Sequence, residues 1–138
     1  MKRLISFTLI LLLLLALSAC KPTYSTDTNT YSDAVEITTD KESYPTNAKE
    51  IKFTVKNVSD GEECFGFKLQ LLRNCDGEWK KVDYNKEVAW IDLAQILEPG
   101  AECEKTMFLS EWYRLPLEKG EYKIVLSDYA VSNKFKVE

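Results

Sequence analysis

Short alternations of apolar and polar residues recur from residue 34 to the last residue of the chain. In residues 50–56, polar side chains separate Ile51, Phe53 and Val55, which is the period of a strand with one buried face. The same pattern occurs at residues 34–38, 65–71, 78–82, 102–109, 122–126 and 131–137. It predicts a series of short strands, each half buried.

Turn signals separate the predicted strands. Asp76-Gly77 lies between two alternating segments and predicts a tight hairpin, because glycine readily takes the positive φ of such a turn. Further signals lie at residues 44–47, 57–61, 99–100 and 115–120. Residues 88–97 fit a short strand and a single helical turn equally well. Seven or eight strands and no long helix predict an all-β fold, an antiparallel β-sandwich.

The first twenty residues have the order of an export signal. A basic start at residues 1–3 precedes an apolar run at residues 4–17, which is broken by only two hydroxyl residues. That run is too short for a helix across a hydrocarbon core of about 30 Å, and it has the length of a signal-peptide core. Leu17-Ser18-Ala19-Cys20 then resembles the lipobox of bacterial lipoproteins.

The lipobox resemblance implies that the Cys20 thiol takes a diacylglyceryl group and that cleavage falls just before it. An uncleaved anchor helix and an ordinary secretory signal with an incidental cysteine are the alternatives. We therefore expect a signal peptide at residues 1–19, a lipidated Cys20 and flexible Thr/Ser-rich linker at residues 20–33, and one domain at residues 34–138. The domain would stand on the extracytoplasmic face of the cell membrane, or at the outer membrane in a cell that has one.

Charge and composition narrow the function classes. Removing residues 1–19 leaves 16 basic against 22 acidic residues, a net charge of −6, which argues against binding of nucleic acid and against electrostatic adhesion to anionic lipid. The chain contains no histidine, which excludes Ser-His-Asp and Cys-His catalysis and every zinc site with a histidine ligand. We expect no enzymatic activity, cofactor or metal. A carboxylate-only enzyme would need a buried acidic pair in a cleft.

The tryptophans are the best candidates for a binding surface, because aromatic side chains dominate interface hot spots and carbohydrate platforms. The candidates are Trp79, Trp90 and the pair Trp112-Tyr113. Packing in the core or over an edge of the sandwich is the alternative interpretation of each.

Three cysteines remain beside Cys20. Cys64 and Cys75 bracket one predicted extended strand of about ten residues, roughly 30 Å, which is too long for a disulfide between them. Export permits a bond of Cys103 with either Cys64 or Cys75. The spacings match no Cys-x-x-Cys motif, so neither a soft-metal site nor a redox thiol is predicted.

Across residues 35–137 the chain resembles the bacterial Ig-like domains of exported lipoproteins and surface proteins. The matching pieces are residues 44–45, 53–59, 65–67, 76–79, 97–100 and 120–124. The resemblance implies an Ig-like sandwich in an extracytoplasmic setting, with no shared reaction or ligand. Within that fold, Tyr122 is expected to bury its ring and hydrogen-bond to the preceding loop, as a tyrosine corner does. The small bacterial intracellular proteinase inhibitors are similar too, but the lipobox contradicts an intracellular role.

Two functions are consistent with these features. The first is a lipid-anchored module, attached to the membrane through Cys20, that holds an envelope protein or a cell-wall polymer. The second is an inhibitor or accessory subunit of an exported enzyme. A binder should show an exposed aromatic patch on a sheet face, whereas an inhibitor should show a protruding rigid loop at residues 83–92 or 110–119.

Overall fold

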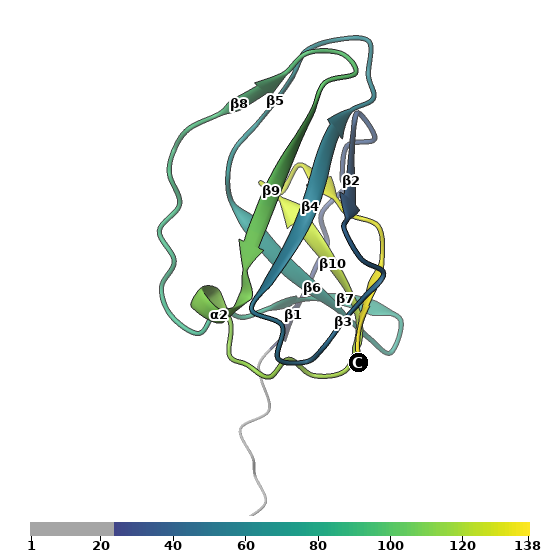
Figure 1. Cartoon of the computed structure of the whole chain (residues 1–138). Coiled ribbons are helices and arrows are strands. Elements are labelled where there is room, and N and C mark those ends of the chain that lie inside the picture. Colours follow the sequence, from purple (N-terminus) through teal and green to yellow (C-terminus); the bar gives the residue numbers. More distant parts are fainter. Residues whose placement is uncertain (1–23) are drawn as a thin grey trace, which may run out of the picture.

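The computed structural model describes residues 24–138, which are built almost wholly of strands (Figure 1). The strands are β1 (Tyr24–Thr26), β2 (Val35–Thr39), β3 (Ser43–Tyr44), β4 (Glu50–Asn57), β5 (Glu63–Phe65), β6 (Leu69–Cys75), β7 (Glu78–Val82), β8 (Gln95–Leu97), β9 (Glu102–Phe108), β10 (Gly120–Leu126), β11 (Ala130–Val131) and β12 (Phe135–Val137). One helical turn, α2 (Leu109–Trp112), follows β9. The predicted signal peptide and Cys20 lie outside the described residues.

Two layers of strands form a sandwich. The larger sheet has the order β1-β7-β6-β10-β12-β3, with β11 also pairing with β10, and the smaller sheet has the order β2-β4-β9. Figure 1 shows the smaller sheet lying across the larger one, with the short pair β5-β8 at one end. All pairs are antiparallel except β12 with β3. The predicted all-β sandwich is confirmed. The described part has twelve strands, more than predicted. The strand predicted at residues 65–71 is divided between β5 and β6, and the one predicted at residues 131–137 is divided between β11 and β12. Two short strands, β1 and β3, are added at the edges of the larger sheet.

The core lies between the two layers, and the alternation in the sequence accounts for it. Ile51, Phe53 and Val55 of β4 are at most 2% exposed and belong to the same cluster of buried side chains as Tyr122 and Ile124 of β10. Each such side chain stabilises the fold by about 1.5–3 kcal/mol through burial. A register slip of one residue in β4 would turn the whole set outward.

Two local predictions are confirmed. The hairpin between β6 and β7 turns at Asp76 and Gly77, whose φ angles are 55° and 90°. Tyr122 is 1% exposed, and its hydroxyl donates to the Glu118 carbonyl at 2.6 Å, as a tyrosine corner does. This bond fixes the loop that enters β10.

The strand predicted over residues 65–71 is interrupted. Its first part belongs to β5, which pairs with β8, and its second part belongs to β6, which pairs with β7 and β10. At the break, the Gly66 amide donates to Ser127 Oγ at 3.2 Å, and a Cβ on Gly66 would lie only 2.7 Å from that oxygen. The missing side chain lets the two segments approach. In the ambiguous stretch 88–97, only Gln95–Leu97 forms a strand, and the rest is irregular.

The spacer predicted to extend to Asp33 is wrong for its described part. Residues 24–26 form β1, which pairs with β7 from Tyr24↔Val82 to Thr26↔Lys80. The pairing uses backbone groups at an open sheet edge, so it needs no apolar pattern in the paired segment. A Thr/Ser-rich composition therefore gave no sign of it.

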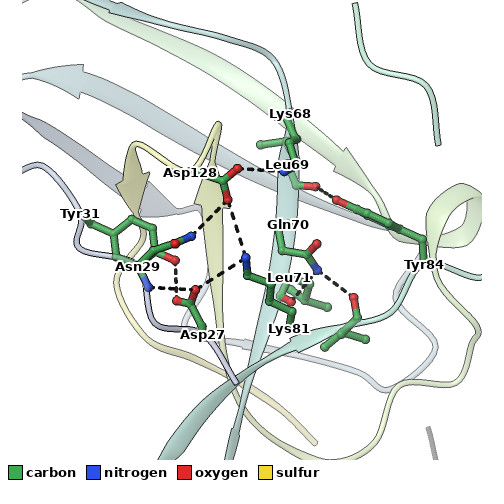
Figure 2. Close-up of polar contacts among 11 residues, drawn as sticks. Asp27, Asn29, Tyr31, Lys68, Leu69, Gln70, Leu71, Lys81, Tyr84 and Asp128 are labelled. Atoms are coloured by element: carbon green, nitrogen blue, oxygen red, sulfur yellow. Dashed lines mark hydrogen bonds and ion pairs between the residues drawn. The ribbon is translucent and has the colours of Figure 1, made fainter. Parts of the chain in front are cut away.

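Side chains of this segment also bind the sheet (Figure 2). The Asp27 side chain is 4% exposed, accepts a hydrogen bond from the Tyr31 hydroxyl, and lies 3.9 Å from Lys81 Nζ. Asn29 donates to Asp128 at 3.3 Å, and Lys68 pairs with Asp128 at 2.8 Å. These contacts join the N-terminal segment to β7 and to the loop between β10 and β11.

Candidate functional site

Four aromatic side chains gather at the end of the sandwich where β9 runs into α2. The Trp90 and Trp112 rings meet edge to face with centroids 4.9 Å apart. Phe108 lies 6.2 Å from Trp112, and Tyr84 lies 6.2 Å from Trp90. We call Tyr84, Trp90, Phe108 and Trp112 the aromatic end cluster. It joins two loops that are well separated in the sequence.

Backbone hydrogen bonds hold the two loops together. The Asn85 amide donates to the Trp112 carbonyl at 2.8 Å, and the Asn85 side chain donates to the Tyr113 carbonyl at 3.1 Å. The Ser110 amide donates to the Lys49 carbonyl at 3.1 Å, which ties α2 to the start of β4. The aromatic end cluster is therefore built on fixed backbone.

Tyr113 is not part of a surface, contrary to the prediction. It is 1% exposed, and its hydroxyl accepts the Leu71 amide at 2.9 Å. Burial raises the pKa of Tyr113 well above its usual range. Trp112 and Tyr113 are neighbours in sequence, but Tyr113 enters the core while Trp112 is half buried at the end of the sandwich. From the core, the Tyr113 ring packs against Tyr84 of the aromatic end cluster, with centroids 5.3 Å apart.

The cluster has a water-facing apolar rim. Phe108 is 41% exposed and Ile91, next to Trp90 in sequence, is 68% exposed, whereas both tryptophans are half buried. Tyr84 is half buried, and burial raises its pKa to about 12 while its hydroxyl donates to the Leu69 carbonyl. The sequence reasoning missed Tyr84, Phe108 and Ile91. For Phe108 a signal existed, because it falls on the outward parity of β9, opposite to buried Met107.

Trp79 lies apart from the other tryptophans. It is half buried on β7, and the Lys123 ammonium sits 4.5 Å from its ring centroid. Trp79 lies three positions before buried Val82 in the same strand, and residues an odd number of positions apart point to opposite faces of a sheet. Trp79 therefore lies on the face of the large sheet turned away from the core. The structure therefore divides the predicted surface into two separate places. Trp79 is the tryptophan that lies on a sheet face.

The two loops predicted for an inhibitor differ. The segment between β7 and β8 stands away from β9 (Figure 1), and Leu93 within it is 61% exposed. The segment after α2 is tied down, because Leu117 is 6% exposed and its amide donates to the Thr46 carbonyl at 2.8 Å. Protrusion is thus confined to the first of the two.

The predicted disulfides of Cys103 with Cys64 or Cys75 are absent. Each of the three cysteines is a free thiol, and they lie on β5, β6 and β9, which belong to three different sheets. Cys64 is exposed and the other two are half buried. The expectation that one strand joins Cys64 to Cys75 fails as well, because the chain changes sheets at Gly66.

Acid–base and metal chemistry gain no support from residues 24–138. In that part of the chain, the shifted carboxyl groups are Glu63 and Glu121, and hydrogen bonds from Tyr129 and Lys134, respectively, lower their pKa. A general acid needs the opposite shift. No group of three acidic or cysteine side chains in this part is placed to hold a metal ion. The described chain also lacks a helix long and apolar enough to cross a membrane.

Sequence comparison adds a family. The family model described as a bacterial Ig-like domain matches residues 31–136. No curated protein matches the chain. The match begins at Tyr31, inside the segment that the structure places against the large sheet.

Solved structures show only a distant likeness. The Pseudomonas fluorescens alkylpurine DNA glycosylase AlkC is 10% identical with a TM-score of 0.43, over 78% of this chain and 31% of that one. A Listeria innocua beta-glucosidase is 22% identical with a TM-score of 0.40, over 75% and 16%. An Erythrobacter marinus b-glucosidase is 13% identical with a TM-score of 0.39, over 85% and 16%. The chain spans less than a third of each of these proteins, and none of them informs its function.

Proposed function

The chain belongs to the bacterial Ig-like domain family, and on that premise we propose that it is a non-catalytic binding module held at the cell envelope by a lipid on Cys20. Domains of this family are typically interaction modules and have no reaction in common. One observation carries the proposal: a lipobox-like Leu17–Cys20 directly precedes a domain of this kind. The acyl chains would supply the membrane attachment, since two or more hold a protein stably.

The partner in this proposal is an envelope protein or a cell-wall polymer. Trp79 supports the polymer, because a tryptophan on a sheet face offers a flat apolar surface to a sugar ring. The Lys123 ammonium lies over this ring, 4.5 Å from its centroid, so a sugar that stacks on the same face displaces it, and the displaced ammonium can pair with an acidic group on that ligand. Nucleic acid is not a partner in this proposal, because the mature chain would carry a net charge of −6.

In-cell crosslinking followed by mass spectrometry tests the proposal, with Cys20→Ala as the control. We expect acyl groups on the intact mature chain, membrane fractionation that depends on Cys20, and either one anchor-dependent protein or retention on isolated cell wall. If Trp79→Ala abolishes retention of the protein on isolated cell wall and Trp90→Ala leaves that retention unchanged, the partner is a cell-wall polymer that binds at Trp79. A chain without acyl groups, or one that stays membrane-bound as Cys20→Ala after signal cleavage, would contradict the anchor.

An inhibitor or accessory subunit of an exported enzyme is the second candidate. The segment between β7 and β8 favours it, because Leu93 is 61% exposed there and Ile96, in the adjoining strand β8, is exposed to the same extent. Crosslinks from residues 93–96 to a single exported enzyme, with a change of its activity on addition of the domain, would establish this function. Crosslinks that avoid the segment would argue against it.

A further inference from the structure

We propose that the aromatic end of the sandwich rests on the bilayer surface in which Cys20 is anchored. The inference rests on the proposed lipidation and adds an interaction surface to it. That surface, the membrane-facing patch, consists of Trp90, Ile91, Phe108 and Trp112. Its ligand is the interfacial layer of the membrane.

The first argument is the length of chain between the lipid and the fold. The strand β1 begins at Tyr24, only four residues after Cys20. Four residues span at most about 14 Å between the two Cα atoms, at about 3.3–3.6 Å each. A spacer that continued to Asp33 would have reached about 43 Å by the same measure. The pairing of β1 with β7 therefore holds the domain close to the bilayer.

The second argument is where the chain leaves the domain. Tyr24 is the partner of Val82 at the end of β7, and Tyr84 follows two residues later. Tyr84 lies 6.2 Å from Trp90, which lies 4.9 Å from Trp112. Figure 1 shows β1 and α2 at the same end of the sandwich. The end nearest the lipid is thus the end that carries the aromatic side chains.

The third argument is that the short connection is secured. The Asp27 side chain is 4% exposed, accepts a hydrogen bond from Tyr31 and lies 3.9 Å from Lys81 Nζ (Figure 2). The Asp27 amide also donates to the Trp79 carbonyl at 2.9 Å. Peeling β1 away to lengthen the tether would break all of these contacts together.

The chemistry of the patch suits the membrane interface. Tryptophan combines a large apolar ring with one N–H donor and is enriched where water meets hydrocarbon. Ile91 and Phe108 add apolar side chains that are 68% and 41% exposed. The acidic net charge excludes electrostatic attraction as the source of contact, so burial of apolar area is the driving force.

The geometry disfavours a protein as the occupant of this patch. A folded domain of 100 residues has a radius of gyration of about 13 Å, so its full thickness exceeds the reach of about 14 Å between Cys20 and Tyr24. A partner docked on the patch would have to share that gap with the headgroups. Partners therefore have room at the other surfaces, including the face that carries Trp79.

Tryptophan quenching by brominated lipid tests the inference. The mature protein, lipidated at Cys20, is reconstituted into phosphatidylcholine vesicles, with or without acyl chains brominated close to the headgroup. Flotation of the vesicles reports anchoring separately from quenching. Three proteins are compared: wild type, Trp79→Phe, and the double variant Trp90→Phe/Trp112→Phe, in which Trp79 is the remaining tryptophan.

We expect Trp79→Phe to keep the quenching of the wild type and the double variant to lose most of it. All three proteins should float with the vesicles. Floating protein whose emission is unquenched, or is quenched equally in the double variant, would overturn the membrane-facing patch and leave the lipid anchor standing. If the protein purified from its cell envelope carries no acyl groups on Cys20 and therefore does not float, the anchor on which the inference rests is refuted instead.

Discussion

Asp27 and Lys81 lie on neighbouring strand segments, with their carboxylate and ammonium 3.9 Å apart. The Asp27 side chain is 4% exposed, whereas that of Lys81 is 32% exposed. The Tyr31 hydroxyl also donates to Asp27, so this buried carboxylate has partners both on β7 and within the N-terminal segment. It makes residues 24–31 part of the folded domain.

Replacing Asp27 should release this segment before it unfolds the sandwich. In Asp27→Ala the Tyr31 hydroxyl and the Lys81 ammonium lose a partner, and we expect the free energy of unfolding to fall by about 1–2 kcal/mol. Hydrogen exchange should accelerate first at residues 25–27. Asp33→Ala, an exposed acid in the same segment, is the matched control. Equal exchange in the two variants would show that Asp27 does not hold β1.

The hairpin between β6 and β7 gives a test with two matched glycines. Neither Gly61 nor Gly77 has a neighbour within 4 Å of an added Cβ, but Gly77 has a φ of +90°. Gly77→Ala should therefore cost about 1–2 kcal/mol of backbone strain, whereas Gly61→Ala should change stability by less than about 0.5 kcal/mol. Urea unfolding at a fixed pH measures both. Equal midpoints would mean that the turn adapts at no cost.

Two buried tyrosines should respond differently to loss of the hydroxyl. Tyr113→Phe leaves the buried Leu71 amide without the oxygen that accepts it, which costs about 1–3 kcal/mol. Tyr122→Phe removes a donor to the carbonyl of exposed Glu118, which water can replace, so the cost should be nearer 1 kcal/mol. Denaturant curves of equal slope give the ranking. The reverse order would contradict it.

The main strands could be predicted because burial follows side-chain period. Ile51, Phe53 and Val55 had to share a face in any strand, and that face had to be buried. The same logic found β6, β7, β9 and β10. The alternation of apolar and polar side chains says nothing about a polar segment that pairs through its backbone, so β1 could not be foreseen from residues 24–26. The same alternation cannot show where a chain passes from one sheet to another, as it does at Gly66.

The candidate surface was harder to predict than the fold. All three tryptophans satisfied the same criterion, yet Trp90 and Trp112 meet only because the loops after β7 and β9 close on each other through Asn85. Loop closure depends on long-range packing rather than on local pattern. Trp112 and Tyr113 further show that neighbouring aromatic residues can have different environments, since Trp112 lies at the rim of the sandwich and Tyr113 lies in its core.

The thiols should behave as three independent groups. Cys64 is exposed while Cys75 and Cys103 are half buried, so a maleimide should label Cys64 first in the native domain. The intact mass of the domain under oxidising and reducing conditions should be the same, apart from adducts. Cys64→Ser should remove the fast labelling phase. A mass two daltons lower without reductant would reveal a disulfide and contradict the separation of the three cysteines among the sheets.

Acid should weaken the contact between Glu63 and Tyr129. Hydrogen bonds from the Tyr129 and Ser59 hydroxyls favour the ionised carboxylate, so the pKa of Glu63 lies below its ordinary value of 4.5. The unfolded chain then binds the proton more readily than the folded one, and stability from this group is fully present above pH 4.5. It is lost as the pH falls through the lower pKa of the folded state.

In Tyr129→Phe, the pKa of Glu63 should rise toward 4.5 and part of the acid sensitivity should disappear. A carbon-detected NMR titration of the Glu63 carboxyl measures the shift, and Glu62→Gln at the exposed neighbouring acid should leave it unchanged. Because the same bond joins β5 to the loop after β10, a Glu63 that titrates at 4.5 in the native protein would mean that this end of the sandwich is not closed.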